Sequence, residues 1–170
     1  MALTVRDAKA LDATEVAGVH IRAWQVAYRG IFPDAFLDGL RVEERASRYV
    51  FGSTAADAPE TILAVEDDAV CGFAAVGPSR DADAPDAGEL RALYIDPSHW
   101  ARGVGGLLLG HGYARLRARG FAEAILWLLV GNERAERFYR ADGWEPDGSH
   151  RQEDVWGVDA NVIRFRRSLR

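Results

Sequence analysis

Stretches in which apolar residues alternate with polar ones, or follow one another without a break, mark the expected strands of this chain. Residues 61–66 and 69–76 alternate with period two, and Asp67-Asp68 between them is typical of a hairpin turn. Residues 124–130 are almost wholly apolar, as expected for a strand buried on both faces. Shorter stretches predict four more strands, at residues 3–6, 89–95, 144–146 and 160–166.

Elsewhere apolar residues recur every three or four positions, which is the spacing of one face of a helix. Val16, Val19 and Ala23 show this spacing near the N-terminus. Asn132 is suited to cap the start of a helix, and Gly120 to end one. The pattern predicts helices at residues 8–28, 34–40, 42–51, 103–119 and 132–141.

The expected order is a strand, helices, three strands, a helix, a strand, a helix and two final strands. This order contains too few strand–helix–strand units for a doubly wound sheet, so it predicts an α/β fold with a mixed sheet and helices on both faces. Residues 77–88 are rich in proline, aspartate and small residues and are expected to form a mobile loop. Because no repeat or long linker divides the chain, residues 1–170 are expected to form one domain.

Composition narrows the classes of function. With 48% hydrophobic and 28% charged residues among 170, the chain has the make-up of a globular protein. Its net charge of -5 argues against general nucleic-acid binding. No apolar run approaches the ~18 residues of a membrane span, and the N-terminus lacks the order of a signal peptide. We therefore expect a cytoplasmic protein with no membrane association.

Cysteine and histidine bear on the chemistry. The single cysteine, Cys71, allows neither an internal disulfide nor a thiolate zinc cluster. The four histidines show no metal-ligand spacing, so no metal is expected. Cys71 lies in an expected strand away from basic residues, where a thiol is usually inert. A covalent acyl-cysteine intermediate is therefore not expected.

The most informative stretch is the glycine turn between the expected strand 89–95 and the helix 103–119. Glycines let the backbone approach a ligand, and the free amides at a helix start favour an anion such as phosphate. Leu108 stands where a dinucleotide fingerprint needs its third glycine, and the only lysine, Lys9, is too far away for a P-loop. The turn is therefore either a phosphate site of another kind or simply the start of a helix.

Three blocks of residues resemble the GNAT (Gcn5-related) N-acetyltransferase superfamily. Gly103 and Gly105 match the second half of its loop pattern Gln/Arg-x-x-Gly-x-Gly/Ala, while Trp100 departs from the first position. Residues 132–144 resemble the family segment Asn-x-x-Ala-x-x-Phe-Tyr-x-x-x-Gly-Phe, with Trp144 at its last position. Residues 88–97 resemble the strand that precedes the loop.

The resemblance implies a GNAT-like central sheet that is mostly antiparallel, with acetyl-CoA as co-substrate. It implies direct transfer of the acetyl group to a primary amine in a ternary complex, and it is compatible with a homodimer. The acceptor is expected to be a small molecule or a peptide. Two alternatives remain open, a peptide or protein N-terminal acetyltransferase and a non-catalytic CoA-binding regulatory module.

The resemblance also implies roles for individual residues. Tyr139 is the expected general acid for the leaving thiolate, although it is also placed to pack as a helix-face aromatic. Glu89 is the expected base; it is otherwise a solvated acid, and a pair with Arg91 would weaken its basicity. The expected cofactor-binding residues are Leu93, Tyr94, Ile95, Arg102, Gly103, Val104, Gly105, Gly106, Asn132, Ala135 and Phe138.

The acceptor pocket is expected near the first helices. By the same resemblance, Trp24, Tyr28 and Phe32 line it. Aromatic residues at helical spacing are more commonly packed in a core, so this alternative is kept for all three.

Overall fold

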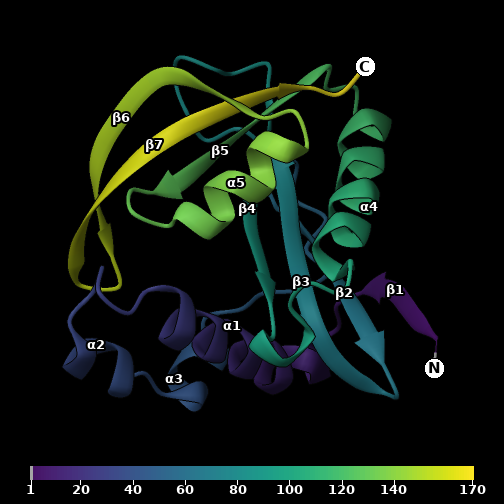
Figure 1. The fold of residues 1–170 in the computed structure, drawn as a ribbon. Helices are drawn as coiled ribbons and strands as arrows, with labels where there is room; N and C mark the ends of the chain where they lie inside the picture. The colour runs from purple at the N-terminus through teal and green to yellow at the C-terminus, as the bar shows by residue number, and fades with distance from the viewer. Residues whose placement is uncertain (1) are drawn as a thin grey trace.

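The computed structural model describes residues 2–170 and is built around one seven-stranded sheet (Figure 1). Its strands run in the order β1-β2-β3-β4-β5-β7-β6. Their bounds are β1 Leu3–Asp7, β2 Glu60–Glu66, β3 Ala69–Pro78, β4 Gly88–Ile95, β5 Glu123–Leu129, β6 Glu145–Val155 and β7 Val158–Ser168. Only β4 and β5 pair in parallel, and the other neighbours are antiparallel. The expectation of a mixed, mostly antiparallel sheet is confirmed.

Helices cover both faces of this sheet. They are α1 Ala13–Ala27, α2 Asp34–Asp38, α3 Val42–Ala46, α4 Val104–Ala118 and α5 Glu133–Ala141, with short 3-10 turns η1 Ala10–Asp12 and η2 Pro97–His99. The largest departures from the predicted helix bounds are at α1 and α3. The first begins at Ala13 because the preceding turn is a 3-10 turn, and α3 ends at Ala46, before Tyr49 and Phe51 pack against the sheet.

Strand β2 shows why the sheet needs cover on both sides. Ile62 and Ala64 pack in the cluster that contains α4, whereas Leu63 and Val65 pack in the cluster that contains α1. Successive side chains of a strand point to opposite faces, so an unbroken apolar run fills two cores at once. The two layers together bury the centre of the sheet.

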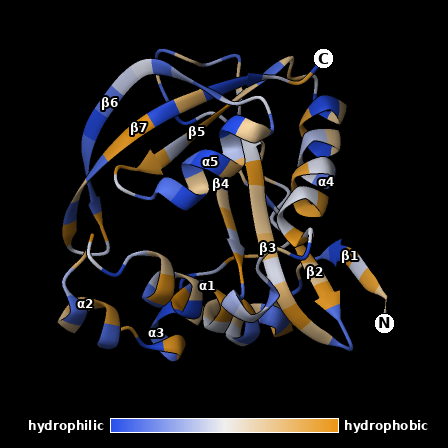
Figure 2. Ribbon diagram, in the orientation of Figure 1, coloured by the Kyte–Doolittle hydropathy of each residue, from blue (hydrophilic) through white to orange (hydrophobic). Residues whose placement is uncertain are grey.

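Strand β6 is much longer than the predicted strand at residues 144–146. It runs over Glu145–Val155 at the edge of the sheet and pairs only with β7. Most of its residues are polar and exposed, and Figure 2 shows β6 largely in hydrophilic colours. Because it has no buried face, its sequence carries no alternation of apolar and polar positions.

The contact between β4 and β5 is short. Their register includes only Gly88 opposite Ala124 and Glu89 opposite Ile125. A bulge in β4 follows, where Val76 of β3 faces Leu90 and Ala75 faces Ala92, leaving Arg91 unpaired. Beyond Glu89 the two strands part, so the backbone of β4 from Leu90 to Ile95 has no partner on the β5 side.

The mobile loop expected at residues 77–88 is shorter in the structure, and its residues 79–87 are tied to the sheet. The side chain of Arg164 on β7 is only 5% exposed and lies 3.0 Å from Asp81, 2.8 Å from Asp83 and 2.6 Å from Asp147. The indole of Trp127 on β5 also donates to Asp81, over 2.9 Å. The aspartates that suggested a solvated loop are thus its anchors.

Replacing Arg164 tests this anchor. In Arg164→Leu, the carboxylates of Asp81 and Asp147 lose their buried cation and keep only the more exposed Arg151 and Arg166, which is expected to cost about 2–4 kcal/mol of unfolding free energy. The matched control is Asp83→Ala, whose side chain is 68% exposed, with an expected loss below about 1 kcal/mol. Urea unfolding of both variants measures the difference, and equal losses would contradict the role assigned to Arg164.

Candidate active site

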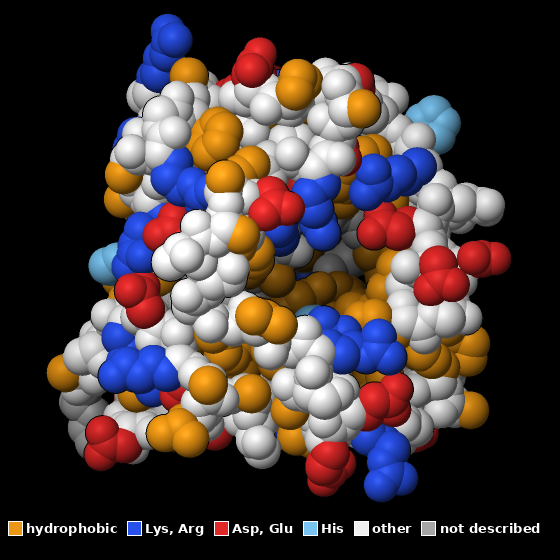
Figure 3. All heavy atoms as spheres, turned by 180° about the vertical axis from the view of Figure 1, so that it is seen from behind, with side chains coloured by type: hydrophobic (Ala, Val, Ile, Leu, Met, Phe, Trp, Pro, Cys, Tyr) orange, Lys and Arg blue, Asp and Glu red, His pale blue; other side chains and the backbone are white. Residues whose placement is uncertain are grey.

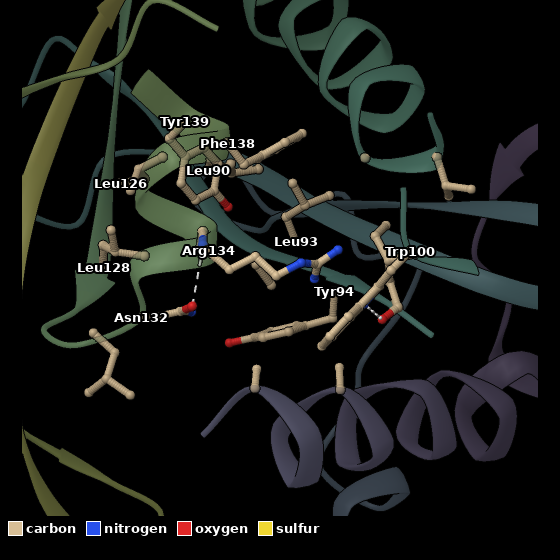
Figure 4. Close-up of a pocket in the computed structure, with 18 of the residues that line it drawn as sticks. Leu90, Leu93, Tyr94, Trp100, Leu126, Leu128, Asn132, Arg134, Phe138 and Tyr139 are labelled. Atoms are coloured by element: carbon tan, nitrogen blue, oxygen red, sulfur yellow. Dashed lines mark hydrogen bonds between the residues drawn. The ribbon is translucent and has the colours of Figure 1, made fainter. Parts of the chain in front are cut away.

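Where β4 and β5 part, they open a cavity of about 450 Å³ (Figure 4). Its walls come from α1, β4, β5, the start of α4 and α5. Leu90, Leu93 and Leu126 line it and belong to the core layer of α4, whereas Ala92 and Tyr94 line it and pack with the layer of α1. The cavity therefore passes through the sheet from one layer to the other.

The front of the cavity is formed by the glycine turn before α4. Gly103 has a φ of +83° and precedes the helix as its N-cap, so the turn uses the left-handed conformation that glycine adopts without strain. Gly103, Val104, Gly105 and Gly106 all line the cavity. The first amides of α4 have no intrahelical acceptor, and the helix dipole adds positive potential there. This end of the cavity is suited to bind an anion.

Helix α5 closes the other side of the front. A side chain at Gly105 would come within 3.0 Å of the Phe138 ring, so glycine there lets α5 lie close to the turn. The Asn132 side chain accepts a hydrogen bond from the Ala135 amide at 3.3 Å and caps this helix. Asn132, Ala135 and Phe138 all line the cavity, as expected of cofactor-binding residues.

The arginine nearest the glycine turn is not the one that the sequence suggested. Arg102 does not line the cavity, because its guanidinium pairs with Glu66 of β2 at 3.0 Å. Arg134 of α5 does line it, and its guanidinium lies 3.6 Å from the ring centre of Trp100 (Figure 4). Trp100 is fixed in turn by a 2.9 Å hydrogen bond from its indole to the Ile95 carbonyl.

Arg134 carries a positive charge that no acidic side chain neutralises. Among residues 2–170 it forms no ion pair, and burial, followed by the like charge of Arg137, lowers the pKa of its guanidinium. Guanidinium remains charged in proteins, so Arg134 is available to an anionic ligand. Sequence reasoning treated Trp100 as a departure from the loop pattern and did not examine Arg134, four positions before Phe138 on the same helix face.

Tyr139 lies on the same helix and lines the cavity. It is 8% exposed and belongs to the core layer of α4, and Figure 4 shows it extending from α5 toward the cavity. Burial raises the pKa of this phenol well above its ordinary value. Tyr139 therefore keeps its proton at every pH at which the protein is expected to work.

Glu89 does not reach the cavity. It is 2% exposed, and its carboxylate accepts hydrogen bonds from the Arg80 amide at 3.0 Å and from the Arg80 guanidinium at 3.2 and 2.7 Å. The partner considered from the sequence, Arg91, instead donates to the Pro78 and Asp57 carbonyls. The position of Glu89, engaged by three donors and outside the cavity wall, gives no support for direct proton removal.

The three aromatic residues expected around the acceptor have different positions. Tyr28 lines the cavity, and its hydroxyl lies 3.5 Å from that of Tyr94. Trp24 and Phe32 do not line it; they are 4% and 5% exposed and pack in one core cluster. Trp24 and Phe32 are therefore packed in the core, which was the alternative to lining the acceptor pocket.

The rear of the molecule is hollowed. Figure 3, seen from behind, shows a hollow with a hydrophobic floor and with basic and acidic side chains around its rim. The cavity wall includes Trp127 of β5 and Ala92 of β4, outside the α4 core layer, so we take this hollow as the rear mouth of the cavity. Sequence reasoning missed Trp127, which it counted only as part of an apolar strand.

Cys71, the remaining candidate for chemistry, does not line the cavity. Cys71 is 1% exposed, its thiol donates to the Ala64 carbonyl at 3.4 Å, and burial raises its pKa. Within residues 2–170, no group of three or more metal-ligating side chains is found. No helix in that range is long and apolar enough to cross a membrane.

Comparison with known proteins agrees with this geometry. The Acetyltransferase (GNAT) family matches residues 21–144. An uncharacterized N-acetyltransferase, YuaI of Bacillus subtilis, is 30% identical over 76% of this chain and 73% of its own length.

Solved structures share the fold. The PaiA N-acetyltransferase of Thermoplasma acidophilum, in complex with coenzyme A, has a TM-score of 0.74 at 19% identity and covers 99% of both chains. YncA of Salmonella typhimurium, a putative acetyltransferase with its cofactor acetyl-CoA, has a TM-score of 0.69 at 16% identity over 100% of this chain and 95% of its own. The parted strands, the glycine turn and the family match lead to one conclusion: the chain belongs to the GNAT family of acetyltransferases.

Proposed function

We propose that the protein transfers the acetyl group of acetyl-CoA directly to an amine, with both reactants bound in one cavity. The observation that carries this proposal is that the cavity crosses the sheet where β4 and β5 part. The thioester is held at the front and the amine enters from the rear mouth. Holding two reactants in attack geometry removes much of the entropic barrier to their reaction.

The cofactor's phosphates fit the front of the cavity. The free amides of residues 104–106 and the guanidinium of Arg134 supply donors and positive charge there. The pantetheine arm is proposed to run along Leu93, Tyr94 and Ile95, because β4 has no strand partner on that side. Its amides are then met by unpaired backbone groups of β4.

Tyr139 is proposed to protonate the leaving thiolate. A general acid must hold a proton before the transition state and lie within the site, and Tyr139 satisfies both conditions. The acyl group passes from sulfur to the amine nitrogen, the C–S bond breaks, and the thiolate takes the phenolic proton. The proton that the amine loses to water returns through water to the phenolate, which restores Tyr139. Cys71 is buried and does not line the cavity, so the proposed transfer passes through no enzyme thiol.

The proton of the amine needs a route other than Glu89. We assign Glu89 to positioning, because its pair with Arg80 joins β4 to the segment 79–87. Water in the rear mouth is proposed to take the proton, beside the hydroxyls of Tyr28 and Tyr94.

Replacing Tyr139 by Phe is expected to lower kcat by about 10²-fold while the KM for acetyl-CoA changes less than about twofold. Because burial raises its pKa, Tyr139 causes no loss of activity as the pH rises to about 10. The matched control is Tyr113→Phe, a buried tyrosine of α4 outside the cavity wall. Thiol release measured over pH 6–10 tests both points, and an unchanged kcat in Tyr139→Phe rules out the acid role.

Glu89→Gln separates a positioning residue from a base. The amide keeps an oxygen acceptor for Arg80, so kcat is expected to fall less than about fivefold, whereas loss of a general base costs about 10²–10⁴-fold. The pH profile of kcat/KM should keep its wild-type shape. A loss of about 10²-fold together with a changed acidic limb would restore Glu89 as the base.

Arg134→Gln is expected to raise the dissociation constant of CoA about tenfold, since it removes one charge-assisted contact. Arg102→Gln is the matched control, because Arg102 is engaged by Glu66, and its effect is expected to stay below about twofold. Calorimetric titration measures the dissociation constants of CoA and of pantetheine, which lacks the phosphates. A loss of affinity for CoA alone shows that Arg134 contacts phosphate. Equal weakening of both ligands by Arg134→Gln would show that Arg134 does not contact phosphate.

A further inference from the structure

The α1 side of the cavity is lined by one apolar cluster. Five residues line the cavity and also belong to this cluster or pack against it: Ala27, Tyr28, Tyr94, Trp127 and Leu129. They come from α1, β4 and β5, and we call them the apolar wall. The hydrophobic floor of the rear hollow in Figure 3 fits such a wall. An apolar part of a ligand that lies against it is removed from water, which favours binding.

The polar groups of the apolar wall are weak and uncharged. The hydroxyls of Tyr28 and Tyr94 lie 3.5 Å apart. Burial raises the pKa of Tyr28 well above its ordinary value, so this phenol keeps its proton. The indole of Trp127 already donates to Asp81 at 2.9 Å. The wall therefore offers two hydroxyls for hydrogen bonds to an amine and no charge to pair with a second ionic group.

No acidic side chain of residues 2–170 lines the cavity. In adjoining segments, Glu89 pairs with Arg80 at 2.7 Å. Arg151, whose guanidinium lies 3.8 Å from the ring centre of Trp127, pairs with Asp81 at 3.2 Å. Because these charges are paired with one another, a second ammonium group on the acceptor would lose water without gaining a counter-charge, which is costly.

The arginines that line the cavity do not make an anion site at the apolar wall. Arg134 stands at the front, where it rests on Trp100. The guanidinium of Arg91 donates to the Pro78 carbonyl at 2.8 Å, and a side chain at Gly77 would come within 3.1 Å of it. Both contacts are with β3, which lies on the side of β4 away from β5. A carboxylate on the acceptor would therefore also lack a partner at the wall.

We propose that the acceptor is a primary monoamine whose remaining part is apolar, an alkyl or arylalkyl group, and that the apolar wall binds this part. The proposal rests on the acetyl transfer proposed above and adds the class of acceptor: apolar monoamines in preference to polyamines and amino acids. A site without carboxylates also favours the neutral form of the amine, which is the form that attacks the thioester.

Two comparisons of acceptors test the proposal. Hexylamine and cadaverine, the diamine of equal chain length, differ in one end group, a methyl against an ammonium. Phenethylamine and phenylalanine differ in the carboxylate. In each comparison the apolar monoamine is expected to have at least about tenfold higher kcat/KM than its charged partner.

Ala27→Glu supplies the missing carboxylate, and Ala27→Gln is its matched control, since the two new side chains have nearly the same shape. The ratio of kcat/KM for cadaverine to that for hexylamine is expected to be at least about fivefold higher in Ala27→Glu than in Ala27→Gln. Val26→Glu and Val26→Gln repeat the comparison at a lining position that is 52% exposed and tolerates charge if Ala27→Glu does not fold. Binding of CoA identifies the variants that fold.

The proposal is overturned if the unaltered protein uses cadaverine or phenylalanine as well as the matching monoamine, or if a folded glutamate variant leaves the ratio unchanged. Calorimetric binding of the four compounds to the CoA-saturated protein is measured in parallel. If no acetyl transfer occurs but the monoamines bind at least about tenfold better than their charged partners, the proposed transfer fails and the apolar acceptor site stands. Equal binding within each comparison, or binding of none of the four, overturns the site.

Discussion

The short parallel contact between β4 and β5 determines where the sheet opens into a cavity. Two residue pairs join these strands, and every other junction of the sheet is antiparallel and longer. A sheet that stayed paired here would have no interior space, because both of its faces are filled by helices. By parting after Glu89, the strands leave unpaired backbone and a passage between the two layers. The glycine turn and α5 meet at the front of that passage.

Charge pairing decides which ionic groups can serve a ligand. Most arginines with carboxylates nearby form ion pairs within the protein. Arg164 pairs with three aspartates, and Arg102 pairs with Glu66. Two arginines line the cavity without a carboxylate partner: Arg91 donates to backbone carbonyls, and Arg134 rests on the ring of Trp100. An aromatic ring orients a guanidinium without neutralising it, which leaves the charge for a bound molecule.

Local patterns in the sequence predicted the layered core and the glycine turn well. The pattern of apolar residues in a strand or helix depends on which of its side chains are buried. It is therefore sufficient to identify the strands at 61–66 and 124–130 and the helix after Gly103. Pairing across the chain was not predictable in this way. That Glu89 meets Arg80, or Arg102 meets Glu66, depends on how distant segments are folded together. Arg134 was missed for the same reason, since its role comes from Trp100, 34 positions earlier in the sequence.

The exposed edge formed by β6 has a consequence for solubility. An unpaired edge strand is a template on which another chain can extend the sheet, and proteins avoid this with charge, proline and irregular backbone. Strand β6 has all three: charge from the basic Arg151 and the acidic Glu153, a proline at Pro146, and an irregular backbone at Gly148, with a φ of +90°. The polar composition that hides β6 from pattern analysis is thus what protects the protein from edge-to-edge aggregation.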